Sequence, residues 1–215
     1  MASGYAQQLE FSCGPFHSGS GGALVGLLIA ACILVVCRIA HQQKIARVIV
    51  RLVAAGVVLY ALLFLGFSLF SHETVLAQGE EKYFCEWDCH LAYSVVAVKA
   101  QASPGATRYS VTLRTRFDET TTAPWRPKDY PLQPSPRTVF LIDSLGHSFA
   151  PQSVSGTPLM TDLVPGQNYT TELSFDVPAA AQGLRLLVAT TSGWPDRLAI
   201  GDENSYLHKK TYFAI

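Results

Sequence analysis

The stretch YSVTLRTRF (residues 109–117) decides how the C-terminal part of the chain folds. Alternate positions carry large apolar side chains or threonine: Tyr109, Val111, Leu113 and Thr115. The positions between them are polar: Ser110, Thr112, Arg114 and Arg116. Because successive side chains of a β-strand point to opposite faces, this alternation predicts a strand that is buried on one face.

Other short stretches of the same character lie on both sides of it. The further predicted strands are residues 92–100, 138–143, 169–177, 184–190, 197–200 and 211–215. The sequences SPGA, SLGH, LVPGQN and SGWPD between them contain the glycine and proline typical of turns. About seven short strands without a helical periodicity predict a membrane-anchored all-β protein with an immunoglobulin-like β-sandwich over residues 91–215.

One long connection between the predicted strands is rich in proline. Residues 120–137, called the Pro-rich loop below, contain five prolines together with Trp125 and Tyr130. So many prolines exclude a helix or a central strand. Long loops of this kind are either functional or disordered. The two aromatic side chains indicate that the loop docks, either on its own sandwich or on a partner protein.

The first third of the chain differs in composition. No Asp or Glu occurs between Glu10 and Glu73, although charged residues make up 15% of the whole chain. Two apolar runs, residues 21–40 and 52–70, each approach the roughly 20 residues that cross a bilayer. We therefore predict a hairpin of two transmembrane helices within residues 21–71, at about 21–40 and 48–70.

Basic residues between the two runs set the predicted topology: Arg38, Lys44, Arg47 and Arg51. Short loops rich in Lys and Arg stay in the cytoplasm. The tail of residues 1–20, the linker of residues 72–90 and the sandwich should then lie outside. The predicted location is the inner membrane of a bacterium, with both termini on the periplasmic side.

Two faces of the predicted helices are candidates for helix packing. The first span carries a stripe of small residues: Gly22, Gly26 and Ala30. Such a stripe lets another helix approach closely, either the second span or a partner subunit. The second span carries aromatic residues on one face: Tyr60, Phe64 and Phe67. These would contact lipid, a partner helix, a quinone or a pigment.

Residues 83–215 resemble a family of bacterial extracytoplasmic immunoglobulin-like domains of the immunoprotective-extracellular type. The resemblance rests on TVFLIDSLGHSFAP (residues 138–151) and on the LVPGQ and FDVP sequences that follow (residues 163–167 and 175–178). The closing IGDENSYLHKKTYFAI (residues 200–215) is similar to a subgroup that also has a C…CH opening. The resemblance implies the fold and an extracytoplasmic location, and no particular activity.

The stretch YFCEWDCHLAYSV (residues 83–95) places Cys85, Cys89 and His90 close together. Outside the cytoplasm thiols tend to pair, and a separation of four residues permits a disulfide across a turn. We therefore predict a Cys85–Cys89 disulfide. The alternative is a copper or zinc site, which would need further ligands such as His208. The adjacent positions of Cys89 and His90 make it hard for both side chains to reach one metal ion.

The rest of the sequence offers little for catalysis or nucleic-acid binding. The net charge is zero, and no basic patch is interleaved with aromatic residues. None of the common hydrolase, metalloprotease or phosphate-loop motifs occurs. Residues 201–210 (GDENSYLHKK) are predicted as a solvated turn in which Lys209 and Lys210 pair with Asp202 and Glu203.

The sequence therefore predicts a non-catalytic protein with other membrane subunits and the lipid bilayer as partners. Its expected role is that of an accessory subunit that stabilises or helps assemble a larger membrane complex. A respiratory or photosynthetic energy-converting complex suits this architecture. Two alternatives remain, a copper-binding or electron-transfer module built on Cys85, Cys89 and His90, and an envelope sensor or ligand-binding domain.

Overall fold

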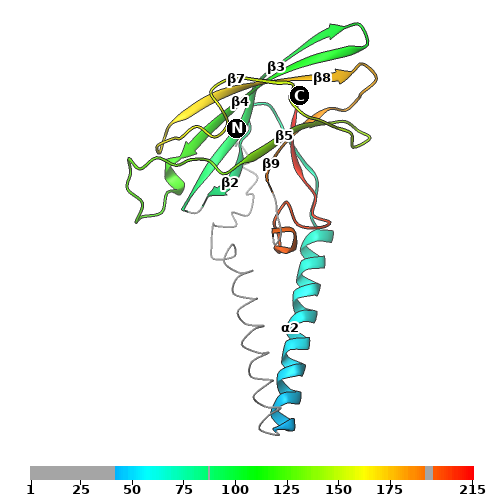
Figure 1. Ribbon diagram of the computed structural model, residues 1–215, viewed down its shortest axis with the longest axis vertical. Coiled ribbons are helices and arrows are strands. Elements are labelled where there is room, and N and C mark those ends of the chain that lie inside the picture. Colours follow the sequence, from blue (N-terminus) through cyan, green and yellow to red (C-terminus); the bar gives the residue numbers. More distant parts are fainter. Residues whose placement is uncertain (1–41, 87, 192–195) are drawn as a thin grey trace, which may run out of the picture. The chain divides into compact units, whose positions relative to one another are not determined.

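The computed structural model describes residues 42–86, 88–191 and 196–215 (Figure 1). The predicted tail of residues 1–20 and the first predicted span, with Gly22, Gly26 and Ala30, lie outside the described residues. The described part contains one long helix, ten strands in two sheets and two short 3-10 helices.

Helix α2 runs from Gln43 to Leu69 and is 27 residues long. At 1.5 Å per residue it measures roughly 40 Å, which exceeds the ~30 Å of bilayer hydrocarbon. Within the described residues it is the one helix that is long and apolar enough to cross a membrane. Its basic residues, Lys44, Arg47 and Arg51, all lie near its N-terminal end. The predicted second span is therefore a helix, and the two-helix hairpin stays a prediction.

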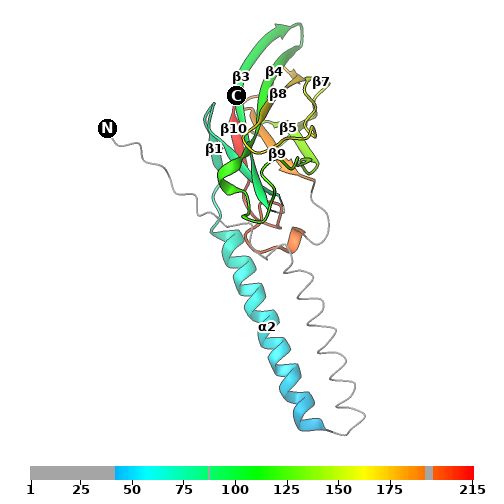
Figure 2. The ribbon, with the colours of Figure 1, turned by 90° about the vertical axis from the view of Figure 1, so that its left-hand side faces the viewer.

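The first sheet has the strand order β1-β10-β9-β5-β6. Its strands are β1 (Thr74–Leu76), β10 (Thr211–Ala214), β9 (Arg185–Thr190), β5 (Arg137–Ile142) and β6 (Ser148–Phe149). Strand β10 lies parallel to β1 and antiparallel to β9, as Figure 2 shows. The chain that leaves α2 is thus paired directly with the C-terminal strand.

The second sheet has the strand order β2-β3-β4-β8-β7, and neighbouring strands are antiparallel. Its strands are β2 (Lys82–Glu86), β3 (Cys89–Ser103), β4 (Ala106–Asp118), β8 (Asn168–Pro178) and β7 (Ser153–Gly156). The stretch that decided the fold lies in β4. Val111, Leu113, Thr115 and Phe117 are buried there and the residues between them are not, as the alternation predicts.

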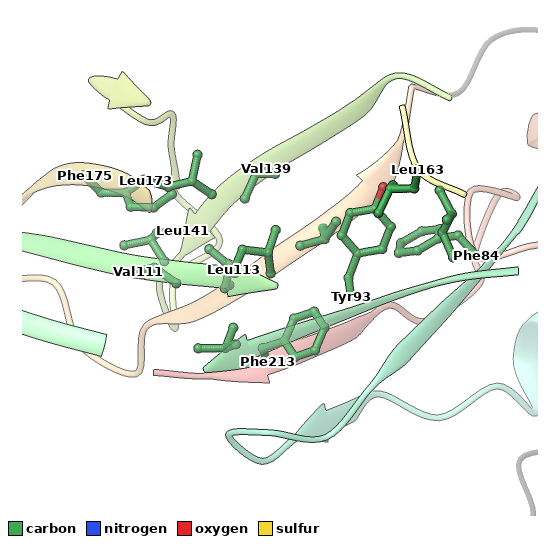
Figure 3. Packing of buried hydrophobic residues seen from close by; sticks show 14 of the residues in the cluster. Phe84, Tyr93, Val111, Leu113, Val139, Leu141, Leu163, Leu173, Phe175 and Phe213 are labelled. Atoms are coloured by element: carbon green, nitrogen blue, oxygen red, sulfur yellow. The ribbon is translucent and has the colours of Figure 1, made fainter. Parts of the chain in front are cut away.

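The core fills the space between the two sheets (Figure 3). The largest fully buried side chains come from both sheets: Tyr93, Phe117 and Phe175 from the second, and Phe213 from the first. Burial of large aromatic side chains supplies much of the hydrophobic stabilisation of such a core. The predicted β-sandwich is confirmed.

Two expectations about individual segments need correction. Residues 72–90 do not form a simple linker, because they contain β1 and β2 and the first residues of β3. Residues 197–200 do not form a strand, because the chain makes the 3-10 helix η3 (Asp196–Leu198) at that point. The other 3-10 helix, η2 (Glu119–Thr121), directly follows β4.

Candidate functional site

The hairpin formed by β2 and β3 determines where the two cysteines point. Cys85 pairs across the hairpin with His90, and Glu86 pairs with Cys89. Cross-strand partners share a face of the sheet, and successive residues alternate between faces. Cys85 therefore points outward with His90, whereas Cys89 points into the core. The predicted pairing of Cys85 with Cys89 does not form: Cys85 is disulfide-bonded, but Cys89 retains a buried thiol. A spacing of four residues across this hairpin places the two side chains on opposite faces.

The thiol of Cys89 is buried. Burial, followed by a hydrogen bond to the carboxylate of Asp88, raises the pKa of this thiol to about 12. A thiol with so high a pKa stays protonated at neutral pH and is a poor nucleophile or metal ligand. On the outer face the Sγ atom of Cys85 lies 3.4 Å from Nε2 of His90.

The metal-site alternative is not supported by this arrangement. In the described part of the chain, no three His, Cys, Asp or Glu side chains are grouped closely enough to hold a metal ion. The ring nitrogen Nδ1 of His208 lies 2.8 Å from the carbonyl oxygen of Lys209, so His208 does not join Cys85 and His90. The predicted ligands are therefore divided between the core, the outer face of β2 and β3, and a separate segment.

The acidic residues of the same stretch have clear partners. Glu86 points inward at the end of β2, and its carboxylate forms an ion pair with Arg137. The side-chain exposure of Arg137 is 0% and that of Glu86 is 5%. The Glu86 carboxylate also accepts a 2.6 Å hydrogen bond from the hydroxyl of Ser135. Glu86 thus fixes the C-terminal end of the Pro-rich loop.

Asp88, in the turn of the hairpin, holds the first half of the Pro-rich loop. Its carboxylate accepts a 2.6 Å hydrogen bond from Arg126, whose side chain is 7% exposed. Its backbone carbonyl accepts a 2.8 Å hydrogen bond from the amide of Ala123. The Arg126 guanidinium lies over the rings of Phe117 and Tyr130, at 5.6 and 5.5 Å from their centroids. We call Glu86, Asp88, Arg126, Ser135 and Arg137 the loop clamp.

A third attachment lies in the middle of the loop. Leu132 and Leu163 form an isolated antiparallel bridge, in which each backbone amide donates to the other's carbonyl oxygen, with N···O distances of 2.7 and 3.0 Å. Leu132 also packs against the core. The polar and aliphatic side chains of the loop therefore dock on their own sandwich, which was one of the two expectations.

The two aromatic residues of the loop behave differently. The side chain of Trp125 is 77% exposed and that of Tyr130 is 60% exposed. Large aromatic side chains are favoured anchors of protein–protein interfaces. The loop clamp holds the backbone on either side of them, so that a firmly attached loop presents two exposed rings.

The predicted aromatic face of the second span is present on α2. The rings of Tyr60 and Phe64 are stacked, with centroids 6.2 Å apart. The hydroxyl of Tyr60 donates a hydrogen bond to the carbonyl oxygen of Leu198. The side chain of Phe67 is partly exposed. Contact of this face with lipid, a quinone, a pigment or a partner helix stays a prediction.

Residues 201–210, called the closing segment below, are held by a buried lysine. Lys82, the first inward residue of β2, lies 2.7 Å from the carboxylate of Glu203. Its ammonium also donates to the carbonyl oxygens of Val188 and Thr211, at 2.8 and 3.0 Å. The ammonium of Lys210 donates instead to the backbone carbonyl of Glu203. The prediction that Lys209 and Lys210 pair with Asp202 and Glu203 is therefore corrected: Lys82 is the ion-pair partner of Glu203.

The residues that organise this site were absent from the sequence-based predictions: Lys82, Glu86, Asp88, Arg126 and Arg137. One pattern in the sequence could have identified β2. Lys82, Phe84 and Glu86 alternate with Tyr83 and Cys85, which is the period of a strand. The inward positions are charged at both ends, so the stretch lacks the apolar alternation that usually reveals a strand.

No protein-family model and no curated protein matches this sequence. Among solved structures, the chain is similar to MPT63, a secreted protein of Mycobacterium tuberculosis. The two are 12% identical with a TM-score of 0.42, over 68% of this chain and 98% of MPT63. It is also similar to an uncharacterized β-sandwich protein of Clostridium difficile 630, at 7% identity and a TM-score of 0.36, over 66% of this chain and 95% of that one. A DUF1425 family member of Shewanella sp. pv-4 is 19% identical, with a TM-score of 0.28, over 55% of this chain and 96% of that one.

Proposed function

We propose that this protein is a non-catalytic accessory subunit of a bacterial membrane complex, which it helps to assemble or stabilise. Helix α2 would anchor it in the inner membrane, and the Pro-rich loop would contact a partner subunit. The observation that carries this proposal is the exposure of Trp125 and Tyr130 on a loop fixed by the loop clamp.

A clamped loop suits protein binding for an energetic reason. Association costs free energy when loops and side chains must be ordered at the interface. The ion pairs of Glu86 with Arg137 and of Asp88 with Arg126 already order the Pro-rich loop in the unbound chain. Five prolines further restrict its backbone. A partner would therefore gain the burial of Trp125 and Tyr130 at a small ordering cost.

The charge distribution along α2 supports an extracytoplasmic sandwich. Lys44, Arg47 and Arg51 lie near the N-terminal end of the helix, and its last turn contains no basic residue. Under the positive-inside rule the N-terminal end then faces the cytoplasm. The sandwich, which follows the C-terminal end, would lie on the periplasmic side.

Co-purification from the native membrane tests this proposal. The full-length tagged protein is extracted in mild detergent, and its partners are quantified by mass spectrometry. A Trp125→Ala/Tyr130→Ala variant is compared with Val154→Ala, which changes a side chain that is 55% exposed on β7. Interface anchors contribute about 2 kcal/mol or more each, so the double variant should retain partners at least ~30-fold less strongly.

Both variants should remain folded, because they alter exposed side chains. Unchanged partner recovery with the double variant would exclude the Pro-rich loop as the contact surface. Migration of the wild-type protein as a monomer, without partners, would overturn the subunit proposal as a whole.

A further inference from the structure

The tip of the closing segment exposes an apolar pair beside basic residues. The side chains of Tyr206 and Leu207 are 51% and 64% exposed. They are followed by His208 and by the exposed Lys209. Among the residues that the structure describes, no carboxylate lies within ion-pair distance of the Lys209 ammonium, whereas Lys210 is turned toward Glu203 and Asn204.

Leu207 occupies an unusual backbone conformation. Its φ of 67° lies in the left-handed region, and Leu207 is the one non-glycine residue with positive φ in the described part of the chain. This conformation is sterically unfavourable for a residue with a Cβ atom and persists only where the surroundings impose it. Here the neighbours of Leu207 are tied down: Ser205 and Tyr206 donate backbone hydrogen bonds to Asp202 and Arg197. The segment thus holds an apolar side chain outward at a cost in free energy.

The tip is attached to α2 at two levels, at Ser71 just beyond the helix end and, through Leu198, at Tyr60 nine residues before that end. These attachments locate it relative to a membrane that α2 crosses. The backbone amide of Lys209 donates a 2.9 Å hydrogen bond to the hydroxyl of Ser71, which also donates to the carbonyl of Ser68. Ser71 lies two residues beyond the last residue of α2, so it is within about 8 Å of the helix end. The polar headgroup layer on each side of the hydrocarbon is about 5–8 Å thick.

We propose that the tip of the closing segment is a lipid-binding surface for anionic phospholipid headgroups on the outer side of the membrane. Tyr206 and Leu207 enter the boundary between headgroups and acyl chains, and Lys209, with His208 beside it, contacts the phosphates. Amphipathic rings and basic side chains are the residues that favour this depth. The proposal rests on the proposed function only in requiring that α2 crosses a membrane.

Site-specific photo-crosslinking tests the lipid contact. A Leu207→p-benzoylphenylalanine variant of the full chain is reconstituted in nanodiscs of phosphatidylcholine with and without phosphatidylglycerol. Illumination should give phospholipid adducts, detected by intact-mass spectrometry. A variant with the same replacement at Leu145 should give none. Leu145 is 80% exposed and lies in the turn after β5, near the end of β9 that is remote from the closing segment.

The charge of Lys209 is tested in the same experiment. The share of phosphatidylglycerol among the adducts should exceed its share in the nanodisc, by up to about fivefold for one basic residue near the surface. In Lys209→Gln the share of phosphatidylglycerol among the adducts should fall toward its share in the nanodisc, while the total yield of adducts changes little. An excess that Lys209→Gln leaves unchanged would overturn the role given to Lys209.

A third crosslinking position separates failure of this proposal from failure of the membrane anchor. Leu62 is 64% exposed, lies near the centre of the apolar run of residues 52–70, and should crosslink to lipid whenever the helix spans the bilayer. Lipid adducts at Leu62 without adducts at Leu207 would overturn the headgroup contact and leave the anchor intact. Protein adducts at Leu207 in native membranes would also overturn it. An absence of adducts at both positions would reject the anchor itself.

Discussion

The Pro-rich loop and the closing segment are both irregular, and both are fixed by charges on one strand. The inward positions of β2 are Lys82, Phe84 and Glu86. Lys82 holds the closing segment through Glu203, and Glu86 holds the Pro-rich loop through Arg137. Phe84 lies between them, with Nζ of Lys82 5.0 Å and Cζ of Arg137 4.6 Å from its ring centroid.

The two attachments differ in burial. Arg137 and Glu86 are almost completely inaccessible to water, whereas Glu203 is 20% exposed. The Pro-rich loop is accordingly attached to the sandwich at several points and presents Trp125 and Tyr130 without backbone strain. The closing segment is held less deeply and carries the strained Leu207. The difference indicates that the Glu86 end of β2 supports a rigid surface. The Lys82 end supports a strained surface, whose stability depends on what it contacts.

Removal of Glu86 should have the largest effect. Glu86→Ala leaves the buried guanidinium of Arg137 without its carboxylate partner, and breaking a buried ion pair in this way costs about 3–5 kcal/mol. Urea unfolding of the full chain in detergent measures this loss. Glu172→Ala, on the exposed face of β8, is the matched control and should change the free energy of unfolding by less than about 0.5 kcal/mol.

A double variant tests whether the isolated charge is the cause. Glu86→Met/Arg137→Met removes both charges and keeps similar apolar volume, so it should recover most of the lost stability. If the double variant is as unstable as Glu86→Ala, the loss of stability arises from packing or from the lost Ser135 contact. The buried ion pair would then not explain the difference between the two ends of β2.

Removal of Lys82 should have a smaller effect. Lys82→Met leaves Glu203 with its 2.9 Å hydrogen bond from the Thr211 amide and with partial access to water. We expect a loss of about 1–3 kcal/mol, the usual cost of leaving buried hydrogen-bonding groups without partners. Limited proteolysis should then cut within the closing segment before the Pro-rich loop. Lys99→Met on β3 is the control, because Lys99 is exposed. An equal loss of stability from Lys82→Met and Glu86→Ala would contradict the ranking by burial.

The sequence predicted strands where the inward residues are apolar and missed them where they are charged. Strand β4 was predicted because Val111, Leu113 and Phe117 alternate with polar residues. Strand β2 was missed because Lys82 and Glu86 occupy its inward positions. Their partners, Glu203 and Arg137, explain why these inward positions are charged. The partners lie 121 and 51 residues further along the chain.

The predicted pairing of Cys85 with Cys89 was wrong for a related reason. A separation of four residues brings two side chains together on a helix, whereas across a hairpin with a two-residue turn it separates them onto opposite faces. The register of β2 and β3, with Glu86 opposite Cys89, decides between these cases. The spacing of the cysteines can be read from the sequence. The register cannot, because it depends on which residues the rest of the sandwich buries.

The pH dependence of stability gives a third test, with a still smaller effect. Glu81 lies next to Lys82 but pairs outward with Arg116, and this hydrogen bond is the main cause that lowers the pKa of Glu81. A lowered pKa in the folded state contributes stability above the unfolded value, near 4.5, which is lost as the pH falls through the folded value. Thermal unfolding of Glu81→Gln should therefore depend less on pH below about 4.5 than that of the wild type. Asp176, whose pKa is lowered by Arg108, accounts for part of the remaining slope. Identical pH profiles would assign the acid sensitivity to other carboxylates.

Leu207→Gly should have the smallest effect on stability. The sign of this effect should differ between the closing segment and the Pro-rich loop. Glycine adopts positive φ without steric cost, so this variant should be more stable than the wild type in detergent by about 0.5–1 kcal/mol, although the greater entropy of glycine in the unfolded chain reduces the gain. In anionic nanodiscs the gain should shrink or reverse, because the variant loses the apolar side chain that lipid would stabilise. A Tyr130→Gly variant of the Pro-rich loop, where no such strain exists, should be destabilised in both environments. If Leu207→Gly has the same effect in detergent and in lipid, the strain at Leu207 is a local property of the turn and is not coupled to the membrane.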